Sequence, residues 1–387
     1  MRVTEIKYQN FRNIASCETE FSDGINVLWG MNAQGKSNIL EGIYYFARGR
    51  SFRGAGDREL IAFGEDFARM ELSCSRDDAE HEVRLEAVLP KGGKRKLYRN
   101  GAQLTSVVEM MGSFRAVLFC PSQLSVVTGG PLERRTFLDI AISQLSPAYL
   151  TYLRRYSRVL AERNALLKLA GQGSQVSAGE WEVYAEQLAE CAAEIAAYRM
   201  EYVELMQDAV TEYFNGMTGG RETPALTYQS HVPTGALSKP LLGGMAVPSD
   251  TTNQEAKQGL YEKLTANIDR ETVCGATLWG IHKDEVRLTL NGKEAKLYAS
   301  QGQQRSMVLS MKLAEGEIAR QVGGEYPCLL LDDVFSELDE ERRRYILSKI
   351  SGRQIIVTSC EPDIIPVNYY DGNVTFRHVV GGEVSMV

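Results

Sequence analysis

The chain has 387 residues with a formal net charge of −7, and 44% of them are hydrophobic and 24% charged. This composition is typical of a soluble globular protein with more than one core, and no stretch is apolar enough to predict a membrane span. The seven cysteines and four histidines lack metal-ligand spacing, which argues against a zinc site or a disulfide framework. Because the N-terminus lacks the apolar core of a signal peptide, we expect a cytoplasmic location.

An apolar run, Ile25 to Trp29, leads into the pattern G-x-x-x-x-G-K-S over residues 30–37, and an amphipathic helical pattern follows. This order of strand, glycine-rich turn and helix predicts a phosphate-binding loop. Lys36 would lie over the β- and γ-phosphates, and the Ser37 hydroxyl would hold Mg²⁺. The alternative is an ordinary glycine-rich turn with a surface lysine.

The segments between this loop and Phe114 alternate apolar and polar residues, as antiparallel strands do. Asn100-Gly101 indicates a tight hairpin turn between two of them. Basic residues gather on this hairpin and either contact DNA phosphates or form a solvated turn: Lys91, Lys94, Arg95, Lys96 and Arg99.

Helical patterns fill the middle of the chain, over 149–169 and 181–213. In the second, apolar residues recur in a 3,4 alternation from Trp181 through Leu205 to residue 209, which predicts an antiparallel helical hairpin packed along this stripe. Intramolecular packing is favoured over a partner-binding stripe. Residues 216–250 read as a linker that closes an inserted lobe. We therefore expect a helical lobe over 121–274, inserted into a domain formed by 1–120 and 275–387.

A short uncharged run over 327–331 predicts a buried parallel strand that delivers Asp332 and Asp333 at its end. In a nucleotide site, the first carboxylate would hold Mg²⁺ and the second would orient or deprotonate the attacking water. Upstream, residues 286–290 and 295–299 read as a second hairpin. The loop 300–306 would follow this hairpin and open a helix, either as a second anion site that serves a nucleotide held by another copy or as a capped helix start.

Together, these motifs resemble the ABC-type ATPase heads of the SMC and RecF group, and the resemblance to the RecF family runs nearly end to end. Six segments carry it: Asn10–Asn13, Gly49–Arg53, Pro131–Asp139, His282–Glu285, Ser300–Ser306 and Asp332–Asp339. The resemblance implies an α/β fold, namely an ABC-type ATPase head with mixed and antiparallel sheets and an inserted helical lobe with a short antiparallel hairpin.

The resemblance also implies a function in recombinational repair and replication. Such proteins are weak DNA-dependent ATPases that dimerise on ATP, bind double-stranded or gapped DNA, and work with RecR and RecO in loading RecA. Asp333 would be the general base, and Asp332 and Ser37 would hold Mg²⁺. The implied nucleotide-binding residues are Gly30, Asn32, Gly35, Lys36, Ser37, Asn38, Ser300, Gly302, Gln303, Arg305 and Asp339, of which the last five would act from the partner copy or beside the dimer axis.

The sequence departs from the family pattern at two places. Gln123 stands where acidic residues are usual, and we assign it as the γ-phosphate-sensing glutamine; no histidine follows the strand 354–358, which leaves Thr358 as the candidate for the switch position. A local basic face for DNA is a further expectation: Arg12, Arg50, Arg53, Lys94, Arg95 and Lys96.

Two other functions remain open at the level of sequence. A transporter ATPase subunit shares the nucleotide motifs but would couple to a membrane protein. A structural dimer that nucleotide holds together would differ from the ATPase in leaving ATP uncleaved.

Overall fold

The computed structural model describes residues 1–77, 82–233, 242, 253–365 and 373–386. It divides into two compact units. The first comprises Met1–Leu124, Glu212–Arg221 and Val308–Val387, and the second Ser125–Thr211 and Glu222–Met307. Residues 275–307, which we expected in the ATPase domain, fall in the second unit by this division. Most of the linker expected over 216–250 lies outside the described residues.

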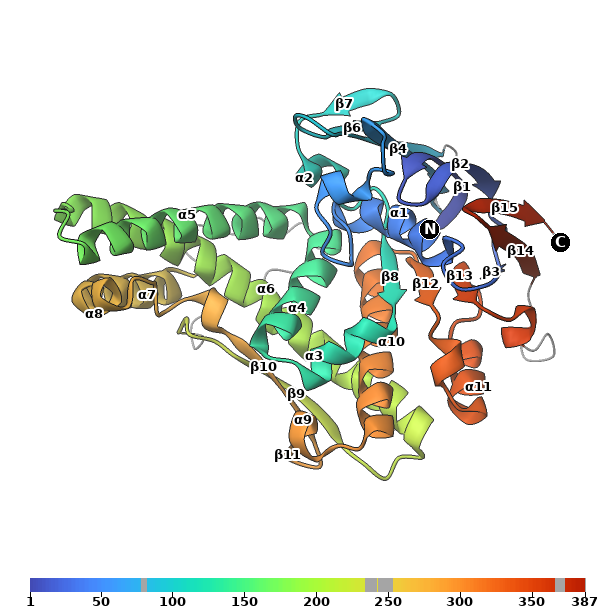
Figure 1. The fold of residues 1–387 in the computed structure, drawn as a ribbon. Coiled ribbons are helices and arrows are strands. Elements are labelled where there is room, and N and C mark those ends of the chain that lie inside the picture. Colours follow the sequence, from blue (N-terminus) through green and yellow to red (C-terminus); the bar gives the residue numbers. More distant parts are fainter. Residues whose placement is uncertain (78–81, 234–241, 243–252, 366–372, 387) are drawn as a thin grey trace. The chain divides into compact units, whose positions relative to one another are not determined.

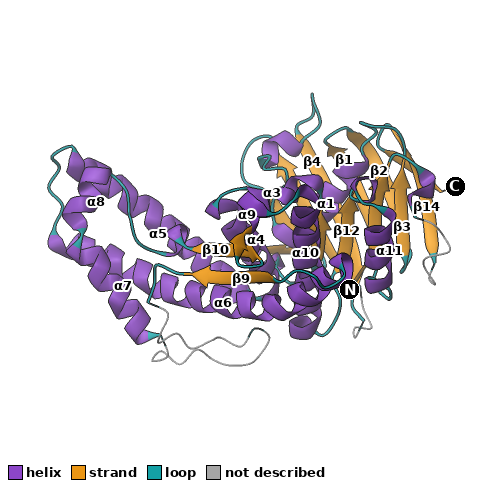
Figure 2. Ribbon diagram, turned by 90° about the horizontal axis from the view of Figure 1, so that it is seen from below, coloured by secondary structure: helices purple, strands orange, loops and turns teal. Residues whose placement is uncertain are grey.

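The first unit is built on a six-stranded sheet with the order β15-β14-β3-β13-β12-β8 (Figure 2). The five strands from β14 to β8 pair in parallel, and β15 closes one edge as an antiparallel partner. Every residue of β8, β12 and β13 is buried, which explains why these strands are apolar up to the polar residues Asp332, Thr358 and Ser359 at the ends of β12 and β13. The strands are β3 (Ile25–Trp29), β8 (Ala116–Phe119), β12 (Cys328–Asp332), β13 (Ile355–Ser359), β14 (Val374–Val380) and β15 (Glu383–Met386).

A second six-stranded sheet, with the order β2-β1-β4-β5-β6-β7, is antiparallel throughout. Its last hairpin turns at Asn100-Gly101, both with positive φ, and pairs Leu97 with Leu104, so the hairpin predicted from this dipeptide is confirmed. The strands are β1 (Arg2–Phe11), β2 (Ile14–Glu20), β4 (Phe67–Ser75), β5 (Val83–Pro90), β6 (Lys96–Arg99) and β7 (Ala102–Leu104).

Helix α1 (Lys36–Arg48) contacts strands of both sheets, and ten of its thirteen residues are therefore buried. Gly42 permits this close packing, since a Cβ there would lie 2.5 Å from the Tyr8 ring of β1. The other regular elements of the first unit are α2 (Val107–Met110), α11 (Glu340–Lys349) and the 3₁₀ turns Asp57–Leu60, Pro121–Leu124, Phe335–Glu337 and Pro362–Ile364.

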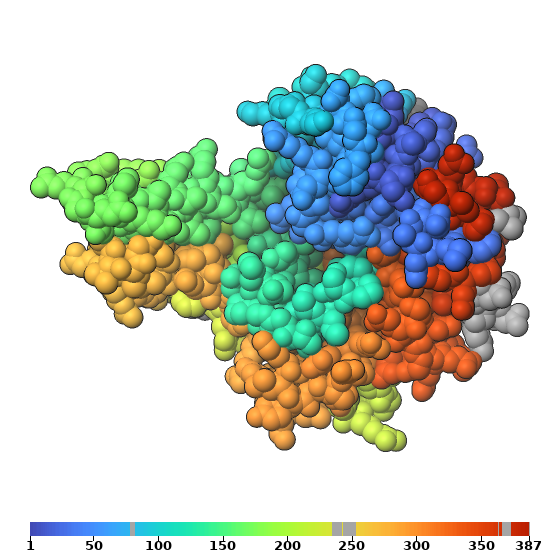
Figure 3. Space-filling view, viewed as in Figure 1, coloured from blue at the N-terminus to red at the C-terminus, as the bar shows by residue number. Residues whose placement is uncertain are grey.

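The second unit is mainly helical and carries the small antiparallel sheet β11-β10-β9. Helices α5 and α8, far apart in sequence, lie side by side, as the green and orange segments of Figure 3 show. Its elements are α3 (Ser125–Thr128), α4 (Pro131–Leu145), α5 (Pro147–Gly171), β9 (Pro224–Gln229), α7 (Gln254–Ala266), α8 (Ile268–Cys274), a 3₁₀ turn Ile281–Lys283, β10 (Glu285–Leu290), β11 (Lys293–Glu294) and α9 (Ala295–Tyr298). Two long helices, α6 (Ala178–Thr218) and α10 (Gln301–Gly323), are labelled in Figure 1, and each contributes residues to both units.

The predicted helical hairpin is confirmed as α5 and α6, but the predicted stripe is wrong at its end. Its positions up to Tyr202 are buried except Tyr184, which is half-buried, whereas Leu205 is 39% exposed and Met206 and Val210 are buried instead. An α-helix has 3.6 residues per turn, so its buried face drifts away from a strict seven-residue repeat.

The second predicted hairpin is also wrong in part. Strand β10 has the expected position, but β11 is only two residues long, and residues 295–298 form the helix α9. The loop 300–306 therefore follows a helix, not a strand. Alanine, lysine and leucine at 295–297 are helix formers, and this local preference prevails over the alternating pattern.

Candidate nucleotide-binding site

The loop 30–37 lies between the end of β3 and the start of α1, as its pattern predicts. Gly30 has a φ of 153°, and a Cβ there would lie 2.4 Å from the Val379 carbonyl oxygen on β14. Gly35 precedes the helix with a φ of 105°, a conformation that strongly favours glycine. Both glycines are thus required by the backbone path of the loop.

Neighbouring segments hold the loop by hydrogen bonds. The Asn13 amide donates to the Ala33 carbonyl at 3.2 Å, and the Gly382 N–H donates to the Gln34 carbonyl at 2.8 Å. The Cys360 thiol donates to Asn32 Oδ1 at 3.0 Å. Because these partners follow β1, β14 and β13, the loop is preformed by the sheets around it.

The interior of the loop has the features that bind a phosphate. Lys36 is 8% exposed, and its ammonium donates to the Gly30 and Met31 carbonyls at 2.5 and 2.8 Å. Among the described residues, no side chain caps the N-terminus of α1, and its first turn holds no acidic residue. The amide dipoles of this helix start, together with a buried ammonium, favour an anion, so the residues present fit a nucleotide phosphate with Ser37 beside it.

The predicted strand before Asp332 is confirmed as β12, and Asp332, 8% exposed, is its last residue. Thr358 is the register partner of Asp332 on β13. Its hydroxyl donates to Asp332 Oδ1 at 2.8 Å and accepts the Asp333 N–H at 3.0 Å. Asp333 has a φ of 54°, and its carbonyl accepts the Ser336 hydroxyl at 2.7 Å. The other Asp332 oxygen has no hydrogen-bond partner in the described part of the chain, which fits the predicted metal ligand.

Glu41, to which the sequence assigned no role, joins two of the family motifs. Its carboxylate is fully buried on α1 and accepts two bonds from the Arg12 guanidinium, at 3.0 and 2.8 Å. It also accepts the Ser51 hydroxyl at 2.5 Å, and Arg53 lies 3.7 Å away. The sequence signal that could have revealed this cluster around Glu41 is a charged residue within the apolar face of α1.

Gln123 lies in the 3₁₀ turn that follows β8, at the same end of the sheet as Asp332, because β8 and β12 are parallel neighbours. Its Oε1 is buried and has no hydrogen-bond partner among the described residues. Burial raises the pKa of Cys120, just before it, and keeps this thiol protonated. An unpartnered buried amide oxygen is compatible with the sensing role predicted for Gln123.

The loop 300–306 forms a capping box at the start of α10. The Ser300 hydroxyl accepts the Gln303 N–H at 3.3 Å, and the Gln303 side chain accepts the Ser300 N–H at 2.6 Å. Gly302 and Arg305 lie in the first turns of this helix, both half-buried. Asp339 likewise caps α11 and accepts the Arg342 N–H at 2.9 Å. Both motifs thus have a structural use within one chain.

The six basic residues predicted to bind DNA differ in their availability. Arg12 is paired with Glu41, and Arg95 donates to the Tyr45 hydroxyl at 2.9 Å and to the Gly49 carbonyl at 2.6 Å. Arg53 donates to Asn38 Oδ1 at 2.8 Å, so Asn38, predicted to bind nucleotide, is engaged in the same contacts. Arg50, Lys94 and Lys96 are the exposed members that form no ion pair with any described residue.

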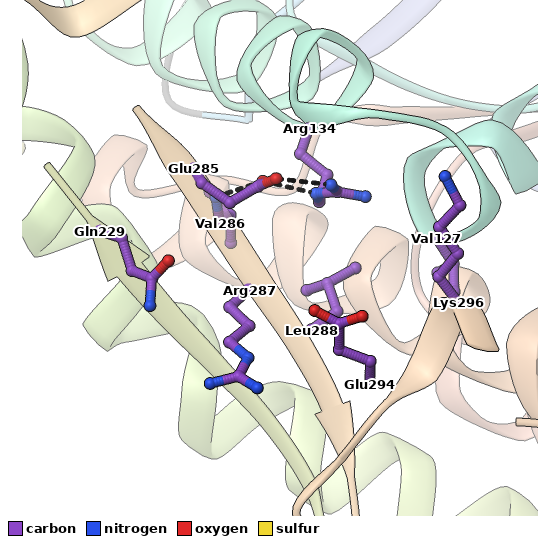
Figure 4. Close-up of a pocket in the computed structure, with 9 residues that line it drawn as sticks. All are labelled: Val127, Arg134, Gln229, Glu285, Val286, Arg287, Leu288, Glu294 and Lys296. Atoms are coloured by element: carbon purple, nitrogen blue, oxygen red, sulfur yellow. Dashed lines mark hydrogen bonds and ion pairs between the residues drawn. The ribbon is translucent and has the colours of Figure 1, made fainter. Parts of the chain in front are cut away.

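A pocket of about 260 Å³ lies within the second unit, between α4, the sheet and α9 (Figure 4). Across it, Arg134 of α4 binds Glu285 of β10 through two bonds of 2.7 Å. Nearby, Arg199 binds Asp139 at 2.8 Å and the Ile281 carbonyl at 2.9 Å. The motifs 131–139 and 282–285 therefore meet in one polar cluster of the second unit.

Within the described ranges, no three histidine, cysteine, aspartate or glutamate side chains are grouped to hold a metal ion. None of the helices described is long and apolar enough to cross a membrane.

The fold and the phosphate loop place the protein in the class of ABC-type ATPase heads that SMC proteins share. A solved SMC head bound to a ScpA domain has a TM-score of 0.56 at 14% identity and covers 100% of this chain and 97% of its own, which shows the fold alone. The family model described as RecF/RecN/SMC N terminal domain matches residues 2–378. The chain belongs to the RecF family.

Relatives named DNA replication and repair protein RecF support this membership. The one from Thermoanaerobacter sp. (strain X514) is 36% identical over 358 residues, which is 92% of this chain and 94% of the relative. The one from Halalkalibacterium halodurans is 36% identical over 365 residues, 94% of each chain. A solved structure of the recombination mediator protein RecF-ATP in the RecFOR pathway has a TM-score of 0.87 at 31% identity and covers 100% of this chain and 97% of its own. The transporter ATPase alternative is therefore wrong.

Proposed function

We propose that this protein is an ATP-dependent DNA-binding protein of recombinational repair and replication. It dimerises around Mg-ATP, binds double-stranded or gapped DNA, hydrolyses ATP slowly, and works with RecO- and RecR-type mediators in loading RecA. The preformed phosphate loop with its buried Lys36 carries this proposal, and the names of the relatives support the DNA repair function.

Each predicted residue has a defined task in the proposed reaction. Lys36 and the start of α1 bind the phosphates, and Ser37 and Asp332 hold Mg²⁺, which supplies charge neutralisation at the phosphates. Asp333 orients or deprotonates the attacking water, and Gln123 contacts the γ-phosphate side of the site. Ser300, Gly302, Gln303 and Arg305 contact the nucleotide of a second copy, with Asp339 beside the dimer axis.

The decisive experiment measures the mass of the protein in solution, with and without Mg-ATP and a gapped duplex. We expect a shift from monomer to dimer that requires Mg-ATP, is strengthened by DNA, and is lost in Lys36→Ala and Ser300→Ala. Ser177→Ala is the matched control, because Ser177 and Glu180 form the same kind of capping box at α6. Each serine change removes a helix cap worth about 1 kcal/mol.

A monomer under every condition would contradict the proposal and leave the loop 300–306 as a helix cap. A turnover assay beside the mass measurement, applied to Asp333→Asn, separates an enzyme from a dimer that is only held together by nucleotide. Loss of turnover with dimerisation retained supports the enzyme, and we expect a wild-type turnover below about 1 s⁻¹, at the slow end of enzymes.

A further inference from the structure

The Thr358 hydroxyl makes two hydrogen bonds, one as donor and one as acceptor. The residue is 2% exposed, and its one hydroxyl proton is donated to Asp332 Oδ1 at 2.8 Å. The oxygen accepts the Asp333 N–H at 3.0 Å. Because a hydroxyl has a single proton, Thr358 has none left for a phosphate while it holds Asp332. Its geometry therefore disagrees with the switch position, in which it would contact the nucleotide.

The bond to the Asp333 N–H has a second effect, on the backbone. Asp333 adopts a left-handed φ of 54°, a conformation that costs a residue with a Cβ roughly 1 to 2 kcal/mol. The Thr358 hydroxyl holds the N–H of this residue, and the Ser336 hydroxyl holds its carbonyl at 2.7 Å. Such conformations persist where the surroundings over-determine them, and here they set the direction of the Asp333 side chain.

The position of Thr358 follows from the sheet. Parallel pairing of β12 with β13 places Thr358 beside Asp332 at the last paired position of both strands. Neighbours in register point to the same face, so a β-branched hydroxyl residue there is directed at the carboxylate. The next residue of the chain, Asp333, has already left the strand.

We infer that Thr358 is a positioning residue, whose hydroxyl orients both the metal-binding Asp332 and the general base Asp333 without contacting the nucleotide. This inference rests on the proposed ATP hydrolysis. It assigns one side chain to the alignment of two carboxylates that have different tasks. Removing the hydroxyl should therefore affect magnesium dependence and turnover together, and should leave phosphate binding by the loop intact.

The test uses the full chain with Thr358→Val, which keeps the shape and removes the hydroxyl, and Thr358→Ser, which keeps the hydroxyl. Thr358→Ala replaces the valine variant if the latter does not fold. Thr375→Val is the matched control, because the Thr375 hydroxyl lies in the same sheet and bonds Ser22 at 2.9 Å. Binding of a fluorescent ATP analogue is measured without metal and over a magnesium titration, and turnover is measured separately.

For Thr358→Val we expect metal-free binding within about twofold of wild type and a magnesium requirement raised by about tenfold, the size of a lost bond to a charged group. Turnover should fall further than binding, Thr358→Ser should restore both, and Thr375→Val should change neither.

Three results would overturn the inference. They are a wild-type magnesium requirement and turnover in Thr358→Val, an equal loss of metal-free binding, or a serine variant as impaired as the valine variant. A wild-type chain that binds but does not hydrolyse ATP would instead overturn the proposed enzyme, while the magnesium titration would still decide the role of Thr358.

Discussion

Many charged and polar residues of the sequence motifs are bonded to one another in this protein. Arg12 is held by Glu41, Arg134 by Glu285, and His282 by Tyr156. The His282 ring shows what this means for protonation. Its Nε2 lies 3.0 Å from the Thr277 carbonyl, which only accepts, so Nε2 carries the proton and Nδ1 accepts the Tyr156 hydroxyl at 2.6 Å. A neutral imidazole satisfies both partners.

Burial lowers the pKa of His282 from 6.5 to about 4. The unfolded chain takes up a proton near pH 6.5 and the folded chain does not, so this histidine leaves stability unchanged above pH 6.5 and reduces it as the pH falls toward 4. Between pH 7.5 and 5, wild type should lose about 1 to 2 kcal/mol more stability than His282→Gln, measured by urea unfolding. Equal losses in the two proteins would show that His282 is not held neutral.

At the scale of elements, the helical hairpin carries charge inside its packing. Arg163 of α5 is fully buried, lies 2.6 Å from the equally buried Glu271 of α8, and donates to the Thr277 hydroxyl at 2.9 Å. Its guanidinium also lies over the Trp181 ring of α6. Arg163 therefore joins three helices, α8 through an ion pair and α6 through the Trp181 ring, where apolar patterning alone predicts a simple hairpin.

Glu271→Gln leaves the Arg163 charge buried without its counter-charge, and we expect it to lower the free energy of unfolding by about 3 to 5 kcal/mol. Glu190→Gln is the control, because Glu190 pairs with Arg155 where both side chains are about 40% exposed. That change should cost less than about 1 kcal/mol. The free energy of unfolding is measured with denaturant. Similar losses in both variants would show that the buried pair contributes no more to stability than the exposed pair.

At the scale of the whole molecule, an acidic chain that binds DNA must present a local basic face. The net charge is −7, and of the six basic residues predicted to bind DNA, Arg12 and Arg95 are engaged in contacts within the first unit. Lys94 and Lys96 are exposed on the segment before and within β6. Arg50 is exposed as well, but the two lysines lie close together in sequence, and they are therefore tested first as candidates for phosphate contacts.

The double change Lys94→Ala and Lys96→Ala should weaken DNA binding and reduce the slope of log affinity against log salt by about 2, since each phosphate contact contributes about 0.9. The control is Lys168→Ala with Lys263→Ala, two exposed lysines of the second unit. Fluorescence anisotropy across a salt series measures both. An unchanged slope in the β6 variant would remove this hairpin from the DNA-binding surface.

Local patterns were sufficient where one segment determines its own structure. The phosphate loop, the Asn100-Gly101 turn, the strand before Asp332 and the hairpin helices α5 and α6 all follow from short-range rules of glycine, turn residues and periodicity. The same rules failed at two places. Residues 295–298 alternate in polarity but form a helix, and Leu205 is exposed although the seven-residue repeat predicts that it is buried. At 295–298 the helix preference of the residues outweighed the alternating pattern. At Leu205 the small difference between 3.5 and 3.6 residues per turn had added up over several turns.

The sequence by itself determined the class of site, because its chemistry depends on residues that are neighbours in the chain: Gly35 with Lys36 and Ser37, and Asp332 with Asp333. Only the tertiary structure decided which side chains, distant in sequence, form hydrogen bonds with the residues of these motifs and with Glu41 on the helix that follows the loop. Thr358 reaches Asp332 through strand pairing, and Arg12 reaches Glu41 through a turn beside α1. Such contacts depend on the register and packing of elements, and no spacing within the chain encodes them.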